Sequence, residues 1–453
     1  MSTEGTSEIS LDRVREMMLA HRVTKLYAKF LSANDNSKNQ PYFGGDFGVL
    51  NILPASTPVP DSTAGNGKSS IFKAALRFGW LDVDGNVYPA PNAKLILYPQ
   101  YPEVRFSGYL SSADRDHRPS SLMGDTRVPN RILLLGVRDD GNIIGFVAGP
   151  ESAVARQVST LASLEQIGVF IRVALNSAQV ATDRESLLWE LCRVSKLGWI
   201  DSKRLNRERE IVSCLAPNCG GYTLEAELGI TPNGYSEPDF KGWEVKQHSV
   251  GRFDRPKDNM ITLMTPEPND GFYVTAGVIP FVEKYGYADL RGRENRLNFG
   301  GIFRSGIRAS RTGLRLELLG YEADSQKISD AAGGIALLDD KGNEAAVWRY
   351  ADLMGHWSRK HALAAYVPSI TRSDSQRQYQ YSSNVLLGIG TTFEKFLSAI
   401  AEGLVVYDPG IKVEGYPETP HSKRRSQFRI KASRLPMLYS LTERISACDD
   451  GRH

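Results

Sequence analysis

The sequence predicts an α/β protein with mixed sheets, organised in two domains. Three observations lead to this prediction. The chain has 453 residues, which exceeds the usual size of one hydrophobic core. Its content of 41% hydrophobic and 24% charged residues is typical of a globular protein. Segments with helical apolar spacing alternate with short runs of branched apolar and aromatic residues that favour strands.

The first third of the chain is predicted to be an α+β unit. Residues 11–31 have helical apolar spacing and end at a polar turn. Three later segments have the composition of strands: residues 94–98, 104–110 and 132–148. In the last of these, Asp-Asp-Gly-Asn separates two apolar runs, which is typical of a hairpin turn. Two helices are expected to follow, at residues 151–178 and 182–197.

The domain boundary is expected between these two helices. We place it near residue 180, so that residues 1–180 form an N-terminal domain and residues 181–453 a C-terminal one. The following segment RLNREREIVSCL has helical character, and TLEAELG is predicted to lie on a helix. Strands are expected next at residues 259–265 and 272–279.

Charge and cysteine content exclude several classes of protein. The net charge of +3 does not by itself indicate a nucleic-acid partner. There is no apolar run long enough to cross a bilayer and no signal-peptide pattern at the polar N-terminus, so we expect a cytoplasmic protein and no membrane partner. The cysteines lack zinc-finger spacing and are expected to be free thiols: Cys192, Cys214, Cys219 and Cys448.

Residues 237–246 (EPDFKGWEVK) combine charged residues with a strand-like pattern. Alternate side chains of a strand share a face, so Glu244 and Lys246 are expected on one side. Trp243 and Val245 are expected on the other. The segment is therefore apolar on one face and charged on the opposite face.

A metal site for phosphodiester hydrolysis fits these residues. Gly242 permits a tight turn that brings Asp239 back beside Glu244. Carboxylate oxygens are hard ligands that suit Mg²⁺, which polarises a phosphate and generates hydroxide. On this hypothesis Asp239 and Glu244 bind the metal, and the backbone carbonyl of Val245 adds a third oxygen. Lys246 then orients the attacking water or offsets charge on the phosphate.

A further carboxylate is available from the predicted helix that precedes this segment. Glu225 in TLEAELG is the candidate, and Glu227, two residues later, should face elsewhere on a helix. Clustered acids raise one another's pKa, whereas a cation relieves their repulsion. Such a site is expected to need a metal or a lysine for stability.

The spacing Pro-Asp-x4-Glu-x-Lys, formed by Pro238, Asp239, Glu244 and Lys246, resembles the PD-(D/E)XK nuclease core. With GYTLEAELGI, the 14-residue step from Glu225 to Asp239, and ITLMTPEP, the chain resembles the MvaI/BcnI group of restriction endonucleases. The resemblance continues through WSRKHALAAYV, YDPG and KRRSQFRI. It covers roughly residues 185–445 and leaves the N-terminal third unexplained.

The resemblance implies a PD-(D/E)XK nuclease core of α/β (α+β mixed sheet) type, with a catalytic lobe and a DNA-recognition lobe around a cleft. It implies the catalytic residues Glu225, Asp239, Glu244 and Lys246. Mg²⁺ is the implied cofactor, for which Mn²⁺ can substitute. The implied partners are double-stranded DNA and a cognate DNA methyltransferase, and the implied assembly is a monomer or homodimer.

Three functions are compatible with this pattern. The first is a type II restriction endonuclease that leaves 5′-phosphate and 3′-hydroxyl ends and defends against foreign DNA. The second is a strand-nicking repair endonuclease similar to MutH. The third is a DNA-binding protein that keeps a nuclease-derived fold without catalysis. The N-terminal domain is interpreted as a second DNA-binding or effector module.

DNA contacts are expected from basic segments of the C-terminal domain. The sequence HSKRRSQFRIKASR contains no acid, and its alternative interpretation is a solvated basic face. The resemblance favours His421, Arg424 and Arg425 as base-reading residues, with Asp408 as an acceptor for cytosine N4. A loop rich in glycine and serine is expected to bind phosphates through Arg304, Arg308 and Arg311. Trp357 and His361 are candidates for the cleft wall, although a core role suits Trp357 equally.

Two weaker signals are set aside. STAGNGKSS matches the end of a phosphate-binding loop, but Ser62 replaces the first glycine and no buried strand precedes it. His248 shares a strand face with Lys246, so contact with the active site or DNA, exposure to solvent and burial in the core all remain open.

Overall fold

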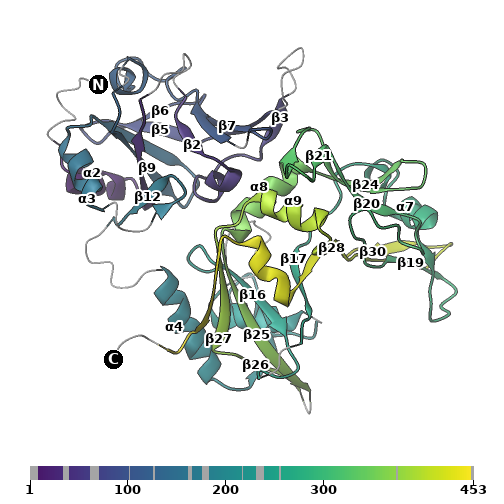
Figure 1. Cartoon of the computed structure of the whole chain (residues 1–453). Coiled ribbons are helices and arrows are strands. Elements are labelled where there is room, and N and C mark those ends of the chain that lie inside the picture. Colours follow the sequence, from purple (N-terminus) through teal and green to yellow (C-terminus); the bar gives the residue numbers. More distant parts are fainter. Residues whose placement is uncertain are drawn as a thin grey trace. The chain divides into compact units, whose positions relative to one another are not determined.

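The computed structural model describes residues 9–33, 40–61, 71–101, 103–125, 128–161, 166–175, 183–216, 218–230, 239–254, 257–373 and 376–449. The chain divides into two compact units, Met1–Val180 (unit 1) and Ala181–His453 (unit 2) (Figure 1). Across these ranges, no helix has the length and apolar character needed to cross a membrane. The glycine-rich loop STAGNGKSS lies outside the described residues, as does Pro238.

Unit 1 begins with helix α2 (Leu11–Ala20), which Ser10 caps by accepting a hydrogen bond from the Arg13 amide at 3.2 Å. The prediction of one helix over residues 11–31 is wrong in its second half, because strand β1 (Val23–Leu31) follows. Arg22 has a positive φ of 60° and ends the helix. Pairing of β1 with β9 (Arg131–Arg138) along its whole length then outweighs the local helical pattern.

Two sheets make up the rest of unit 1. The seven-stranded sheet has the order β11 (Gln166–Ile167), β12 (Phe170–Val173), β1, β9, β10 (Ile143–Ala148), β5 (Phe78–Leu81), β6 (Val87–Pro89). The five-stranded sheet has the order β2 (Tyr42–Gly44), β8 (Glu103–Ser107), β7 (Lys94–Tyr98), β4 (Ile71–Ala75), β3 (Val59–Asp61). The predicted strand at 94–98 and the hairpin over 132–148 are confirmed, and the strand predicted at 104–110 is confirmed only as far as Ser107, where β8 ends.

Each face of the seven-stranded sheet is buried. Helix α2 and helix α3 (Ala153–Leu161) cover one face, where Val14, Val158 and Phe146 belong to a single core cluster. On the other face, aromatic rings join the two sheets, and Phe106 of β8 lies 5.2 Å from Phe78 of β5. The predicted helix over 151–178 is therefore too long, because its later part is recruited as strands β11 and β12 at the edge of the sheet.

Unit 2 begins with helix α4 (Asp183–Lys196), which confirms the predicted helix ending before Gly198. Its main sheet has the order β13 (Ile200–Asp201), β26 (Arg377–Tyr381), β25 (Leu363–Ser373), β27 (Asn384–Ile389), β32 (Leu441–Ser446). Strand β16 (Glu244–Ser249) pairs with β25 in parallel. Helices α4 and α5 (Cys219–Glu227) pack against this sheet through a core that includes Leu191, Leu224 and Val367.

The segment before α5 forms a hairpin instead of the predicted helix. Its strands are β14 (Lys203–Leu205) and β15 (Ile211–Ser213). Between them, the Asn206 Oδ1 atom accepts a hydrogen bond from the Glu210 amide at 2.8 Å, and Arg209 has a φ of 65°. Asparagine in this role stabilises a turn, which outweighs the helical charge pattern of the segment.

The second part of unit 2 contains smaller sheets (Figure 1). These are β17 (Met260–Met264) with β31 (Phe428–Lys431) and β28 (Val405–Tyr407); β18 (Tyr287–Ala288) with β19 (Arg296–Gly300), β29 (Gly410–Glu414) and β30 (His421–Lys423); β20 (Arg315–Leu319) with β23 (Gly334–Leu338) and β24 (Glu344–Arg349); and the hairpin β21 (Tyr321–Glu322) with β22 (Lys327–Ile328). The remaining elements are α6 (Phe272–Thr275), α7 (Val278–Tyr285), α8 (Tyr350–His361), α9 (Phe393–Ala401) and the 3₁₀ segment η3 (Ala432–Leu438).

Two of the sequence-based predictions for this part have opposite outcomes. The strand predicted at 259–265 is confirmed as β17. The strand predicted at 272–279 is wrong, because α6 and α7 occupy it. Gly271 and Gly277 have φ values of 81° and 93° and begin these helices, which breaks the extended conformation that the apolar run suggests.

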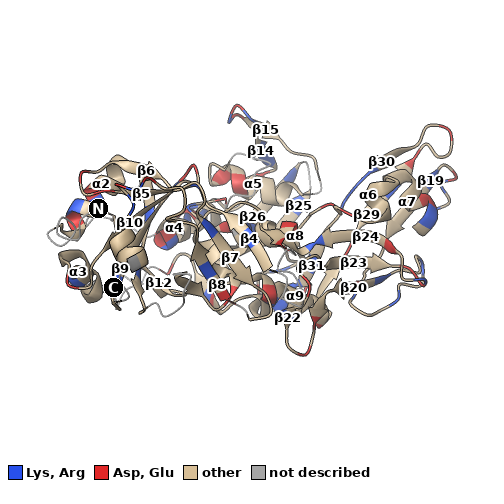
Figure 2. Cartoon of the chain, turned by 90° about the horizontal axis from the view of Figure 1, so that it is seen from above, with Lys and Arg blue, Asp and Glu red and all other residues tan. Residues whose placement is uncertain are grey.

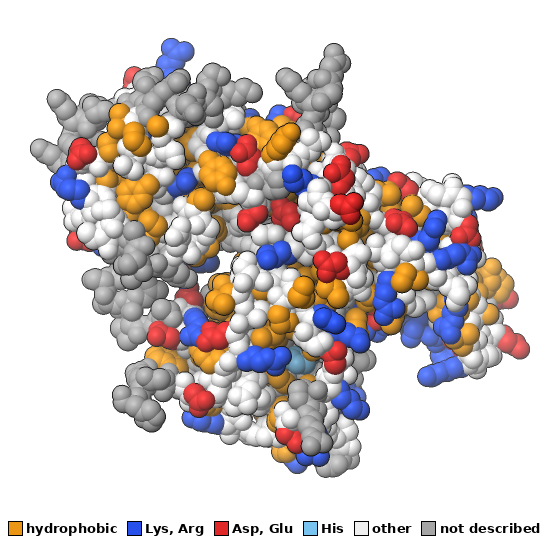
Figure 3. All heavy atoms as spheres, in the orientation of Figure 1, with side chains coloured by type: hydrophobic (Ala, Val, Ile, Leu, Met, Phe, Trp, Pro, Cys, Tyr) orange, Lys and Arg blue, Asp and Glu red, His pale blue; other side chains and the backbone are white. Residues whose placement is uncertain are grey.

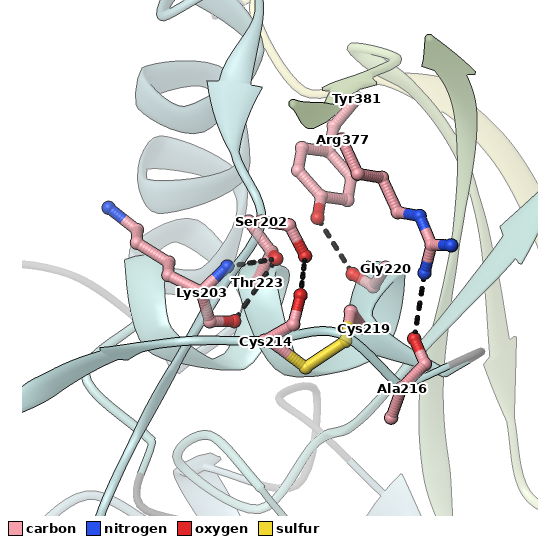
Figure 4. Close-up of a disulfide and its surroundings, with 9 residues drawn as sticks. All are labelled: Ser202, Lys203, Cys214, Ala216, Cys219, Gly220, Thr223, Arg377 and Tyr381. Atoms are coloured by element: carbon pink, nitrogen blue, oxygen red, sulfur yellow. Dashed lines mark hydrogen bonds between the residues drawn. A yellow bond between two sulfur atoms is a disulfide. The ribbon is translucent and has the colours of Figure 1, made fainter. Parts of the chain in front are cut away.

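The expectation of free thiols is also wrong. The cysteines form two disulfides, Cys192–Cys448 and Cys214–Cys219. The first joins residues 256 positions apart, a proximity that spacing in the sequence cannot reveal. The second joins the end of hairpin β14–β15 to the first residue of α5, where Ser202 Oγ donates a hydrogen bond to the Cys214 carbonyl and the Tyr381 hydroxyl donates one to the Gly220 carbonyl (Figure 4).

Candidate active site

A two-residue turn leads into strand β16. Phe240 and Trp243 exchange two backbone hydrogen bonds of 2.9 and 2.8 Å. Between them, Lys241 and Gly242 both have positive φ, 44° and 85°, as a type I′ turn requires. The Asp239 Oδ2 atom accepts a hydrogen bond from the Val245 amide at 3.0 Å. The predicted return of Asp239 toward the strand is thus confirmed.

The two faces of β16 differ as the alternating pattern predicts. Trp243 and Val245 are buried in the core beneath the sheet. On the opposite face, Lys246 Nζ lies 2.9 Å from Glu244 Oε1. Glu244 itself is only 4% exposed, so this ion pair is largely removed from water.

Helix α5 carries acidic residues (Figure 2) and contributes the third carboxylate. Its two glutamates have different surroundings. Glu227 forms ion pairs with Lys203 and with Arg193, the latter at 3.5 Å. Glu225 instead lines a cleft of about 890 Å³ together with Asp239, Glu244 and Lys246. The structure therefore brings together all four residues for which the sequence predicts catalysis.

The carboxyl groups of the cleft lie close together and are buried, which raises the pKa values of two of them. Burial, together with the charges of Asp239 and Glu244, raises the pKa of Glu225 to about 7. Burial and the charge of Glu244 raise the pKa of Asp239 to about 6, although the hydrogen bond from the Val245 amide acts to lower it. Burial opposes the charged form of Lys246, but the Glu244 carboxylate outweighs it and raises the pKa of that lysine. Lys246 is therefore an ammonium ion at neutral pH.

The donor set fits a hard divalent cation. Within the described residues, no donor lies in hydrogen-bonding reach of the buried Glu244 Oε2 atom. The same residues contain no group of three His, Cys, Asp or Glu side chains that forms a ready metal cage. Mg²⁺ suits such a site, because it is usually held by one or two carboxylates and completes its shell with water and substrate oxygens.

Helix α8 adds two cleft residues that the sequence analysis missed. Lys360 Nζ lies 4.0 Å from Glu244 Oε1, and both Lys360 and His356 line the cleft. They are four residues apart and so share one helix face. That spacing was the available signal, but it does not show which face of a helix meets the cleft. His248 also lines the cleft, and burial lowers its pKa to about 4, so its ring is neutral.

The model of the MvaI/BcnI restriction endonuclease family matches residues 188–439, which is more than half of the chain. The chain belongs to this family. It is therefore a nuclease of a class that acts on DNA, and the turn at Lys241 and Gly242 and strand β16 lie inside the matched region. The comparison with curated proteins gave no match.

Two solved structures of a family member are similar to the chain. One is restriction endonuclease MvaI in complex with its cognate DNA substrate, with 17% identity, coverage of 58% of this chain and 99% of that chain, and a TM-score of 0.43. The other is MvaI in the absence of DNA, with 15% identity, the same coverage and a TM-score of 0.32.

The prediction that His361 lines the cleft of this MvaI/BcnI family member is wrong, and of the two roles considered for Trp357 the core role is confirmed. Both are completely buried, and their rings stack with centroids 4.2 Å apart. Trp357 also stacks on Phe396 of α9 at 4.4 Å. These two side chains belong to the face of α8 that packs into the core, and the neighbouring face, with His356 and Lys360, is the one that reaches the cleft.

The three arginines of the loop before β20 are exposed but differ in their partners. Arg308 makes a bidentate ion pair with Asp340, with both nitrogen–oxygen distances at 2.7 Å. The Arg311 guanidinium lies 5.5 Å from the centre of the Tyr287 ring. Arg304 is exposed on the same loop. Figure 3 shows Lys and Arg side chains gathered over this part of unit 2, interspersed with acids.

The predicted base-reading residues lie on β30 and the segment after it. His421 is exposed, with its Nε2 atom 3.7 Å from a Glu414 oxygen. Arg424 is 52% exposed and only loosely paired with Glu267 at 3.9 Å. Arg425 is exposed and lies against Gly410.

Asp408 has a partner that its predicted role did not include. Its carboxylate binds the Arg429 guanidinium, whose second nitrogen donates to the Met260 carbonyl at 3.0 Å. Arg429 lines the cleft, whereas Asp408 is not among the cleft residues that the structure describes. In this structure Asp408 holds a cleft arginine in position.

Proposed function

We propose that this chain is a Mg²⁺-dependent, site-specific endonuclease of type II that hydrolyses DNA to 5′-phosphate and 3′-hydroxyl ends. The observation that carries the proposal is the cleft in which Glu225, Asp239, Glu244 and Lys246 meet, within a chain of the MvaI/BcnI family. Double-stranded DNA is its partner. Its biological role is defence against foreign DNA in the cytoplasm, with a cognate methyltransferase that protects the host.

Asp239 and Glu244 would hold the metal, with the Val245 carbonyl as a further oxygen. Bound Mg²⁺ supplies charge that polarises the phosphate and lowers the pKa of a coordinated water. The Val245 amide fixes one Asp239 oxygen, which leaves the other for a ligand. Glu244 uses Oε1 for Lys246 and keeps Oε2 for a ligand.

Lys246 acts as a hydrogen-bond donor and a fixed positive charge. Its ammonium group, held by Glu244, orients the attacking water and offsets negative charge that develops on the phosphate. Because its pKa is raised, Lys246 keeps its proton and does not serve as a general base in the metal-free chain. Glu225 adds a third carboxylate that can accept a hydrogen bond from water or substrate.

Incubation with supercoiled, unmethylated DNA tests this proposal. The wild-type chain with Mg²⁺ should give discrete fragments, and mapping of their ends gives the recognition site. EDTA should abolish cleavage, and Lys246→Ala should lower its rate on the order of 100-fold to 1,000-fold. Lys196→Ala, which removes an exposed lysine from α4, is the matched control and should cut at the wild-type rate.

The products also separate the alternative functions. Nicked circles that persist without linear product would identify a strand-nicking enzyme. Specific binding without cleavage on either methylated or unmethylated DNA would contradict the endonuclease proposal and favour a non-catalytic DNA-binding protein.

A further inference from the structure

Unit 1 contains a pocket that the nuclease chemistry does not use. Its volume is about 340 Å³, and it is lined by residues of both sheets of this unit. Lys29 and Leu31 come from β1, and Arg131 comes from β9, where it is paired with Leu31 across the two strands. Paired residues share a sheet face, so these side chains point to the same side.

The five-stranded sheet supplies the opposite wall. Tyr42 of β2 and Arg105 of β8 are cross-strand partners, and the Arg105 guanidinium lies 5.3 Å from the centre of the Tyr42 ring. Arg105 also forms an ion pair of 2.9 Å with Glu103. Among the described lining residues, three are cations and Glu103 alone is an acid.

Lys29 is the unusual member of this set. It is only 8% exposed, and its ammonium group has no acidic partner among the residues that the structure describes. Burial lowers the pKa of Lys29, and no acidic charge of the described residues acts against this effect. Burying a charge without a partner costs free energy, so such groups are normally paired or bind a ligand.

Arg131 adds a second buried cation that is held without a carboxylate. It is 3% exposed, and its guanidinium donates hydrogen bonds to three backbone carbonyls, those of Val128, Leu122 and Ser32. These bonds fix the position of its charge at the pocket wall. The positive charge is therefore built into the pocket before any ligand arrives.

We infer that this pocket binds a phosphate group, with Lys29 as its central contact and Arg131 and Arg105 as supporting charges. Cations that approach from two sheets suit a tetrahedral oxyanion, which accepts hydrogen bonds from several directions. The pocket is at the lower end of the volumes that hold small ligands, so the phosphate can carry an attached group. Two sources have this chemistry: a free nucleotide and the backbone of a nucleic-acid strand.

Titration calorimetry on the full chain in EDTA tests the assignment. The probes are inorganic phosphate, a deoxynucleoside monophosphate and a short single-stranded oligonucleotide. Lys29→Met should weaken binding of at least one probe by about tenfold or more, as expected for a lost charged hydrogen bond. Lys29→Arg, which keeps the charge, should retain most of the affinity. Lys25→Met removes a lysine of the same strand outside the pocket and should bind as the wild type does.

The pattern of binding separates the sources. Lys29-dependent binding of the monophosphate identifies a free nucleotide, whereas dependence seen only with the oligonucleotide identifies a nucleic-acid strand. Equal affinities of Lys29→Met and Lys25→Met, or no binding of any probe to the wild type, would overturn the assignment.

A measurement of the unfolding temperature shows whether the Lys29→Met variant is folded. Replacing an unpaired buried charge by an apolar side chain of similar size should preserve or raise the unfolding temperature. The phosphate probe that binds should raise the unfolding temperature of the wild type. Absence of that rise at a saturating concentration would also count against the site.

Discussion

The cleft of unit 2 and the pocket of unit 1 differ in their charge composition. The cleft is lined by three carboxylates and by three basic residues, Lys246, Lys360 and Arg429. Burial and the neighbouring carboxylates raise the pKa values of Asp239 and Glu225. The pocket gathers three cations beside one acid, and Lys29 lacks an acidic partner within the described chain. The cleft therefore sets acids beside cations, whereas the pocket has an excess of cations. The comparison teaches that the two proposed phosphate sites would use different means, a metal ion held by acids in one and basic side chains in the other.

The largest expected effect comes from removing one charge of the acidic cleft. Asp239→Asn keeps an oxygen that can accept the Val245 hydrogen bond, so the turn should persist while a metal ligand is lost. Cleavage measured with Mg²⁺ should fall on the order of 1,000-fold. DNA affinity measured in Ca²⁺ or EDTA should stay close to that of the wild type. A large loss of affinity with unchanged cleavage of bound DNA would show that Asp239 serves binding instead.

The pH dependence of cleavage should follow the two raised pKa values. As the pH falls through about 7 and then about 6, Glu225 and Asp239 take up protons, which compete with the metal. Initial rates at subsaturating Mg²⁺ should therefore fall below neutral pH, and more Mg²⁺ should shift the fall to lower pH. A profile that is flat from pH 5.5 to 8 would contradict the crowded-acid description.

The same carboxylates should make the metal-free chain less stable at high pH. A carboxyl group whose pKa is raised by folding stabilises the folded state below its unfolded pKa. This contribution is lost as the pH rises through the folded value, here about 6 to 7. Urea unfolding should show Glu225→Gln reducing this loss by about 1–3 kcal/mol between pH 5 and 8.

Glu227→Gln is the matched control for that measurement. Glu227 lies on the same helix but is paired with Lys203 and Arg193 outside the cleft. Its removal should leave the loss of stability between pH 5 and 8 close to that of the wild type, and should leave cleavage intact. Equal effects of the two glutamine variants would mean that the repulsion is not located at the cleft.

The smallest expected effects concern cations on the surface of unit 2. Arg424 is loosely paired at 3.9 Å, whereas Arg308 is already neutralised by its bidentate pair with Asp340. Arg424→Ala should therefore weaken specific DNA binding by about 1–3 kcal/mol and relax base preference. Arg308→Ala should change affinity by less than about 1 kcal/mol, because an exposed pair contributes little. Competition binding at fixed salt measures both.

The sequence was sufficient to predict the catalytic strand because its determinants are local. The turn at Lys241 and Gly242 and the alternation from Trp243 to Lys246 depend on neighbours in the chain. Residues 23–31 show the opposite case. Their apolar pattern suits either a helix or a strand, and the choice is made by β9, more than 100 residues away.

Helix α8 shows why the site was only partly predictable. His356 and Lys360 lie four residues apart in this helix, and so do Trp357 and His361. The two residues of each pair share a helix face, so spacing alone does not tell which pair meets the cleft. The packing of Trp357 on Phe396 decides it, and that contact depends on how α9 folds against α8.

The turn between Asp239 and β16 is short. Two residues reverse the chain, and a hydrogen bond from the Val245 amide to the Asp239 carboxylate closes the loop. One residue inserted between Gly242 and Trp243 would move the side chains of the strand to opposite faces, placing carboxylate and ammonium groups in the core and an indole in the cleft. In this segment the number of residues matters as much as their identity, because the two faces of β16 have different surroundings.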